Sequence, residues 1–239
     1  MEEINFTDEE LKKVLNGNYV ASGSEASIYK YKDFVAIRLY DIGDSVFCPV
    51  TGKIVGRPGC ESMIKNLHVY KDNIKLSSFP IGIVKVNDIV VGQLIKYYKN
   101  SLTLTEFFKS SPSVEPMYYY FKVLDILEEL ALNEICYEDV HGGNFLIVGG
   151  GYKLKIIDFS EYRMKINENY KGAYYNMFQN FNSMVNNLNF KVLKADDIYE
   201  RLVIPSEIKN SYENLKESFD YVREQLKGLE RNRSSKNIR

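Results

Sequence analysis

The spacing of apolar residues changes near residue 99, from the short period of strands to the longer period of helices. Before this point, β-branched and aromatic runs separated by turn residues predict five strands, at 20–21, 27–31, 34–40, 81–86 and 89–98. Amphipathic spacing predicts a helix over 8–15, with Thr7 as its N-cap, and a second helix over 61–72. Residues 41–60 are rich in glycine and proline and are expected to form a loop.

Beyond residue 99 the pattern is mainly helical. Thr103 and Glu106 have the spacing of a capping box, and Pro116 suits the first turn of a long helix. A last helix, over about 206–229, carries apolar residues at alternating steps of three and four. Such a stripe permits a homodimer through this helix, although a single stripe of this length more often packs on its own domain.

The exception to the helical pattern is a hairpin. Its apolar runs are Phe145 to Val148 and Leu154 to Ile157, and the glycine triplet 149–151 forms the turn. Together these elements predict an α+β chain of two lobes. Residues 1–96 would form a five-stranded antiparallel sheet with one inserted helix, and residues 97–239 a mainly helical lobe that contains the hairpin.

Composition narrows the class of protein. A chain of 239 residues is long enough for two lobes that share a cleft, and its formal net charge of -1 offers no attraction for nucleic acid. No apolar run approaches the length of a membrane span, and the acidic start, Met1-Glu2-Glu3, does not resemble a signal peptide. The three cysteines form no close pair, which favours a reducing cytoplasm.

Two carboxylates and an amide flank the strands of the hairpin. Asp139 and Asn144 precede the first strand, and Asp158 follows the second. Because a tight hairpin brings the outer ends of its strands together, we expect the three side chains to converge. A carboxylate that accepts a proton, beside two oxygen ligands for a hard cation, is what phosphoryl transfer from a nucleotide requires.

These residues and their order resemble the protein-kinase-like superfamily, which includes eukaryotic-type protein kinases and the aminoglycoside and choline kinases. The catalytic pattern His-x-Asp-x-x-x-x-Asn is similar to Tyr137, Asp139 and Asn144 here, and the metal-binding Asp-Phe-Gly to Asp158-Phe159-Ser160. His141 and Gly143 look more like small-molecule kinases and compact bacterial or phage-type members. The resemblance implies that Asp139 is catalytic and that Asn144 and Asp158 bind Mg²⁺. A structural role inside the loop is expected for His141.

The resemblance also implies residues that bind ATP. Ser22, Gly23 and Ser24 stand where the family has its phosphate-covering loop, although only one of the usual three glycines is present. Val35-Ala36-Ile37-Arg38 is similar to the Val-Ala-Ile-Lys of the family, with Arg38 in place of the lysine that contacts the α- and β-phosphates. Glu61 is the expected ion-pair partner of Arg38.

The adenine-binding residues follow from the same alignment. Ile95 occupies the gatekeeper position, Lys96 and Tyr98 would offer backbone groups to the adenine edge, and Ala36 would pack on the ring. The resemblance therefore implies an ATP- and Mg²⁺-dependent kinase, first of all a protein serine/threonine kinase.

Two departures from the family keep other functions open. The segment after Asp158 is short and contains no Ala-Pro-Glu, which favours a small-molecule kinase. Arg38 and the thinned glycine loop predict altered nucleotide binding, and they favour a nucleotide-binding pseudokinase or scaffold.

Overall fold

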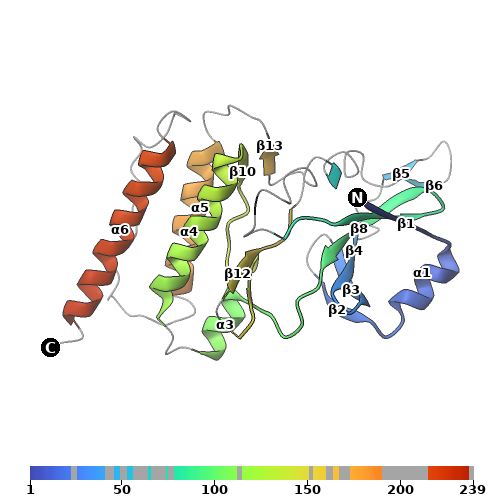
Figure 1. The fold of residues 1–239 in the computed structure, drawn as a ribbon, viewed down its shortest axis with the longest axis horizontal. Coiled ribbons are helices and arrows are strands. Elements are labelled where there is room, and N and C mark those ends of the chain that lie inside the picture. Colours follow the sequence, from blue (N-terminus) through green and yellow to red (C-terminus); the bar gives the residue numbers. More distant parts are fainter. Residues whose placement is uncertain are drawn as a thin grey trace. The chain divides into compact units, whose positions relative to one another are not determined.

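The chain has an α+β fold, with a mixed six-stranded sheet and five helices of described bounds (Figure 1). The computed structural model describes residues 1–22, 26–40, 46–48, 53–55, 64–65, 74, 78–111, 115–150, 153–159, 164–166, 173–189 and 215–236. The chain separates into two compact units, Met1–Lys99 and Asn100–Arg239, and each is treated by itself.

The sheet belongs to unit 1. Its strand order is β1-β7-β8-β4-β3-β2, and β1 runs parallel to β7 whereas all other neighbours are antiparallel. The strands are β1 (Glu2–Phe6), β2 (Tyr19–Ser22), β3 (Ala26–Lys32), β4 (Val35–Tyr40), β7 (Gly82–Val86) and β8 (Ile89–Lys96). All five strands predicted from the sequence are present.

The predicted five-stranded antiparallel sheet is wrong by one strand, β1. This strand carries only two apolar residues and pairs with a segment far along the chain, so local periodicity does not reveal it. Gly82 permits the pairing, because a Cβ there would lie 2.4 Å from the carbonyl oxygen of Glu2. The added parallel edge makes the sheet mixed.

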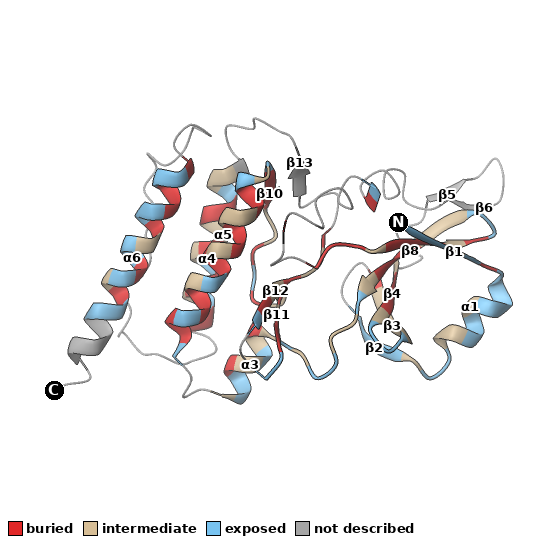
Figure 2. Ribbon diagram, viewed as in Figure 1, coloured by how far each residue is buried: buried red, intermediate tan, exposed pale blue. Residues whose placement is uncertain are grey.

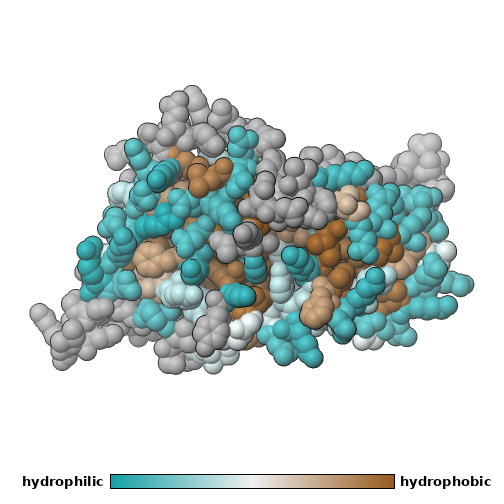
Figure 3. All heavy atoms as spheres, in the orientation of Figure 1, coloured by the Kyte–Doolittle hydropathy of each residue, from teal (hydrophilic) through white to brown (hydrophobic). Residues whose placement is uncertain are grey.

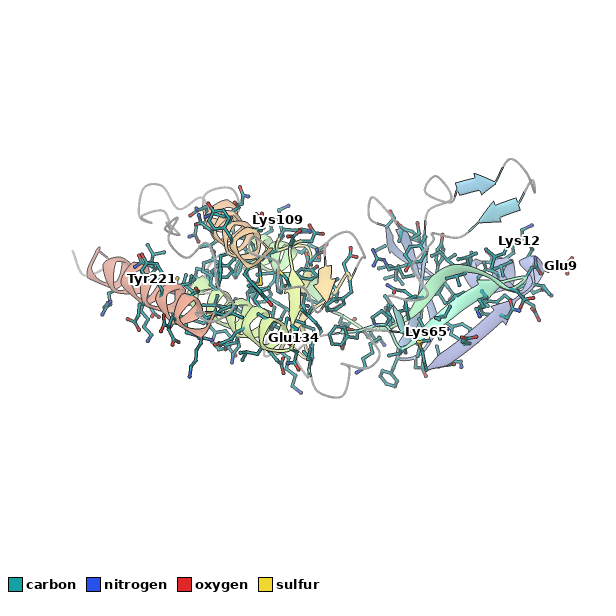
Figure 4. All side chains as sticks on the ribbon, turned by 90° about the horizontal axis from the view of Figure 1, so that it is seen from above. Glu9, Lys12, Lys65, Lys109, Glu134 and Tyr221 are labelled. Carbon is teal, nitrogen blue, oxygen red and sulfur yellow. The ribbon has the colours of Figure 1, made fainter. Side chains whose placement is uncertain are left out.

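One face of this sheet carries the apolar core of unit 1. Phe6, Ile37, Val84, Val86 and Leu94 are buried together there. Helix α1 (Asp8–Leu15) contributes partly buried apolar side chains to the same cluster and begins at the predicted cap, where the Thr7 and Glu10 side chains form a complete capping box. Glu9 and Lys12 of this helix are exposed and are labelled in Figure 4.

The connections of unit 1 agree only partly with the sequence pattern. Asn87 and Asp88 have φ values of 48° and 68°, the left-handed conformation of a tight hairpin turn, as their position predicts. Within the predicted loop 41–60, the strands β5 (Val46–Cys48) and β6 (Lys53–Val55) form a hairpin instead. Of the predicted helix 61–72, only residues 64–65 lie among the described residues, and they are helical.

Unit 2 contains four helices and two small sheets among its described residues. The helices are α3 (Leu104–Ser110), α4 (Pro116–Leu132), α5 (Ala173–Asn187) and α6 (Leu215–Lys236). The strands are β9 (Leu102–Thr103), β10 (Ile135–Tyr137), β11 (Phe145–Val148), β12 (Lys153–Ile156) and β13 (Met164–Ile166). The predicted hairpin is β11–β12, and β9 pairs with its free side.

Helix α4 lies against both α5 and α6, and it is buried along most of its length (Figures 1 and 2). The described residues of the α6 stripe, Leu215, Phe219, Val222, Leu226 and Leu229, are buried, and the Phe219 ring packs edge-on against Phe178 at 4.8 Å. Arg223 of α6 forms ion pairs with Asp125 and Glu128 of α4. The stripe therefore packs within its own chain, and a homodimer through this helix stays a prediction.

Hydrophilic side chains cover much of the surface seen in Figure 3, with apolar ones between them. The most exposed large apolar residue of the described part is Phe34, at 78%. None of the described helices has both the length and the apolarity that crossing a membrane requires.

Candidate functional site

The loop between β10 and β11 holds two of the residues that the sequence singles out. Short backbone hydrogen bonds fold it: the Val140 N–H donates to the Glu138 carbonyl and the Asn144 N–H to the His141 carbonyl, both at 3.0 Å. The loop is also fastened to α3, because the Thr105 N–H donates to the Gly142 carbonyl at 3.2 Å. The loop is therefore held by hydrogen bonds within itself and by a hydrogen bond from helix α3.

Gly142 lies so close to α3 that there is little room for a side chain at this position. A Cβ at this position would lie 2.5 Å from Thr105 Oγ1, so any other residue would force a shift where the loop meets α3. The sequence suggests instead that Gly142 and Gly143 allow a sharp turn, but neither has the positive φ that Gly149 and Gly150 show. The glycine at position 142 is therefore explained by the close contact between the loop and α3, and not by an unusual backbone conformation.

Asn144 is bound to Asp139 through its amide nitrogen. Its Nδ2 donates to Asp139 Oδ2 and to the Asp139 carbonyl, both at 3.0 Å, and to the hydroxyl of Tyr137 at 2.9 Å. Both Asp139 atoms only accept hydrogen bonds, so the nitrogen must face them and Oδ1 must point away. Asn144 is buried, and its Oδ1 accepts no hydrogen bond from the described residues.

Tyr137 connects this amide to the end of the hairpin. Its hydroxyl lies 3.0 Å from the Ile157 carbonyl and 3.1 Å from the Asp158 carbonyl, and its one hydrogen is shared between them. The ring is fully buried and packs edge-on against Phe159 at 5.7 Å. Sequence reasoning assigns Tyr137 no role beyond filling the first position of the motif. The only feature of the sequence that could have indicated this role is the aromatic hydroxyl two residues before Asp139.

Asp158 follows β12 and has a left-handed backbone, with φ 61°. Aspartate tolerates this conformation better than most residues, but it still costs on the order of 1 kcal/mol. Such strain is concentrated at functional sites, where surrounding bonds enforce it. Here the enforcing bonds come from the Tyr137 hydroxyl and from the Ile157 N–H, which donates to the Asn144 carbonyl at 2.9 Å.

The hairpin therefore brings Asp139, Asn144 and Asp158 into one place in unit 2, linked through Tyr137. The groups that this arrangement offers to a ligand are oxygen atoms, from two carboxylates and one amide. Oxygen ligands suit Mg²⁺, which keeps several positions for water and phosphate oxygens. Asn144 Oδ1 and the Asp158 carboxylate would hold such an ion. Among the described residues no group of three or more His, Cys, Asp and Glu could bind a metal.

His141 stands beside Asp139. The Gly143 N–H donates to its Nδ1 at 3.1 Å, and this hydrogen bond agrees with the structural role inside the loop that is expected for His141. Because Nδ1 accepts this bond, the proton of a neutral ring lies on Nε2, which is 3.7 Å from Asp139 Oδ2. The side chain is about half exposed, at 55%. His141 therefore borders the Asp139 carboxylate on the solvent side.

Helix α5 supports the loop from a second direction. Asn180 Nδ2 donates to the Glu138 carbonyl at 2.5 Å, and Asn176, one turn earlier, donates to the Glu138 side chain at 3.4 Å. These two asparagines were not identified from the sequence, since asparagine at helical spacing is common on exposed helix faces. Glu138 is held at its backbone and its carboxylate, directly before Asp139.

The predicted ATP-binding residues within the described part lie in unit 1. Ala36 and Arg38 are buried on β4, opposite Ile95 and Gln93 of β8. Lys96, at the end of β8, is exposed.

Of the remaining predicted ATP-binding residues and the predicted partner of Arg38, only some lie among the described residues. Ser22 ends β2 and is exposed, whereas Gly23, Ser24 and Glu61 lie outside the described residues. The Tyr98 hydroxyl bonds to Ser78 at 3.3 Å. The predicted residues thus form two groups, one in each unit.

Comparison with models of known protein families finds none that matches this chain, and comparison with curated protein sequences finds no match either.

Proposed function

We propose that this chain is a phosphotransferase of the protein-kinase-like type, which uses ATP and Mg²⁺ and transfers the γ-phosphate to a hydroxyl. The observation that carries the proposal is the linked group in unit 2. Asn144 donates directly to Asp139 at 3.0 Å, and the Tyr137 hydroxyl connects Asn144 to the backbone carbonyl of Asp158 by bonds of 2.9 and 3.1 Å. A serine or threonine of a protein is the first candidate acceptor.

The proposed role of each residue follows from the atoms that its hydrogen bonds leave available for a ligand. The side-chain N–H groups of Asn144 donate hydrogen bonds to Asp139 and Tyr137, so its Oδ1 can bind a cation. Asp158 supplies a carboxylate from a fixed, left-handed backbone. The bound Mg²⁺ would neutralise charge on the β- and γ-phosphates. Asp139 would orient the attacking hydroxyl and accept its proton.

Unit 1 would be the nucleotide-binding lobe, and unit 2 the catalytic lobe. In this proposal the buried Arg38 takes the place of the lysine that contacts the α- and β-phosphates. A guanidinium keeps the positive charge and can form paired hydrogen bonds with phosphate, but it is larger and more rigid than an ammonium. Arg38 is thus compatible with phosphate binding in a changed geometry.

One observation favours the small-molecule alternative. The Glu138 carboxylate accepts a hydrogen bond from Asn176 and lies next to Asp139 in the chain. Two adjacent carboxylates suit an acceptor that carries positive charge, as amino sugars and choline do. The position of Glu138 therefore makes a cationic small alcohol the second candidate acceptor.

Transfer of label from γ-labelled ATP tests the proposal. With Mg²⁺, the full chain should label itself or an added protein, and Asp139→Asn should lower the rate by about 10²–10⁴-fold. Asp33→Asn, a change in an exposed turn, is the matched control and should leave the rate unchanged. ADP release stimulated only by small cationic alcohols would support the second acceptor. Nucleotide binding without turnover would identify a pseudokinase and contradict the proposal.

A further inference from the structure

Gln93 of β8 is a buried polar residue with an unmet hydrogen-bonding need. It is 1% exposed, and its Oε1 is buried and accepts no hydrogen bond from any residue that the structure describes. Buried amide groups nearly always find a partner, because losing water without a replacement bond is costly. An amide left in this state is therefore an indication of a missing ligand.

The neighbours of Gln93 on the sheet identify the kind of ligand. Gln93 lies directly opposite Arg38 of β4 and Ile83 of β7, and Arg38 in turn lies opposite Ile28 of β3. Side chains of directly opposed residues share a face, with Cβ atoms about 4.5–5.5 Å apart. Arg38 is 6% exposed. The row therefore places an amide beside a buried guanidinium, with an isoleucine on either side.

This row lies on the face opposite to the apolar core of unit 1. Ile37 and Leu94, the residues next to Arg38 and Gln93 in the chain, both belong to that core. Because successive side chains of a strand alternate between faces, Arg38 and Gln93 point to the other side. The polar pair is thus kept apart from α1 and the core, on the face that also carries Ala36.

We propose, on the basis of the nucleotide site described above, that Gln93 and Arg38 together bind the phosphates of a nucleotide. When the ligand is bound, an N–H of Arg38 donates to Gln93 Oε1, and its other N–H groups donate to phosphate oxygens. The Nε2 of Gln93 then donates to the same phosphates. Arginine has five N–H donors where lysine has three, so it needs an additional acceptor to fix its plane. Gln93 is that acceptor.

Gln93→Met tests this role because methionine has a similar length but no amide. Titration of the full chain with ADP, without Mg²⁺, should show about a tenfold loss of affinity. The Tm of the free protein should rise by about 3 °C, because an unsatisfied amide is removed. A residue with a purely structural role would lower the Tm instead. Gln93→Glu, which sets a carboxylate against the phosphates, should weaken ADP binding further.

Ile83→Val is the matched control. It removes one methylene from the fully buried neighbour of Gln93, so it should lower the Tm and leave the affinity for ADP unchanged. In the Arg38→Met background, Gln93→Met should reduce ADP affinity by a smaller factor than in the wild type, because the bond between Arg38 and Gln93 is already lost and only the Nε2–phosphate bond remains to be removed. Independent effects of the two changes would overturn the inference.

Inorganic tripolyphosphate separates phosphate from base recognition. If Gln93→Met weakens ADP and tripolyphosphate alike, the assignment to phosphate stands. If only ADP is weakened, Gln93 contacts the nucleoside and the assignment is wrong. If the wild type binds ADP through Arg38 but Gln93→Met binds it equally well, this inference fails alone. If the wild type binds no nucleotide, the proposed function fails as well.

Discussion

Replacing Tyr137 with phenylalanine removes the one oxygen atom that links Asn144 to the carbonyls of Ile157 and Asp158. The Tyr137 ring is fully buried and Asn144 is 5% exposed, so the amide loses a hydrogen bond at a site shielded from water. Partners left unsatisfied in this way cost about 1–3 kcal/mol of the free energy of unfolding. For a chain of this size, about 2 kcal/mol corresponds to a Tm lower by about 4–8 °C.

The same change should weaken the cation site. Tyr137 orients Asn144 and holds the left-handed backbone at Asp158, so it supports both predicted ligands without touching the metal. Loss of such a supporting partner typically costs about 10–100-fold in metal affinity or activity. In the labelled-ATP assay, Tyr137→Phe should therefore need about 10–100-fold more Mg²⁺ for half-maximal rate. Excess Mg²⁺ should restore a large part of the activity.

Tyr120→Phe is the matched control for this prediction. The Tyr120 hydroxyl is also buried and donates at 2.6 Å to Asn189, which is not one of the three site residues. It should lower the Tm to a similar extent and leave the Mg²⁺ requirement unchanged. If Tyr137→Phe lowers the Tm without changing the Mg²⁺ requirement, the hydroxyl has only a structural role and the reasoning is refuted.

Two further predictions concern the loop and the first helix. Gly142→Ala should lower the free energy of unfolding in urea by about 1–3 kcal/mol, because its Cβ would meet Thr105 Oγ1 at 2.5 Å; a smaller loss would mean that the loop can move away. The Thr7 backbone amide lowers the pKa of Glu10 below its ordinary value of 4.5, so the carboxylate stabilises the fold above that pH and loses the effect as pH falls through the lowered pKa. Urea unfolding of wild type and Glu10→Gln should therefore differ at pH 7 and converge at low pH, whereas a constant difference would contradict this.

The parts of the site that could be predicted are those set by local geometry. The hairpin β11–β12 has short apolar strands and a glycine turn, and its register places Phe145 opposite Ile156. This pairing brings Asn144 beside Ile157, one residue before Asp158. Capping boxes at Thr7 and Thr103 are equally local, because each depends on two residues three positions apart.

The parts that could not be predicted depend on contacts between distant segments. Strand β1 pairs with β7, which lies at the other end of unit 1 in the sequence. The sequence of β1 is short and acidic, so it shows almost no alternation of apolar and polar residues that would predict a strand. The supports of the loop, from Asn180 and Thr105, are ordinary residues whose role comes only from where their helices pack. Likewise, Gln93 resembles any polar residue in a strand until its burial beside Arg38 is known.

The most direct test of the central claim is a crystal structure of the full chain with Mg²⁺ and a non-hydrolysable ATP analogue. The proposal predicts a metal ion about 2.1 Å from both Asn144 Oδ1 and a carboxylate oxygen of Asp158, with Asp139 facing the γ-phosphate. A nucleotide bound elsewhere, or an Asn144 amide oxygen that stays turned away from the metal, would contradict it.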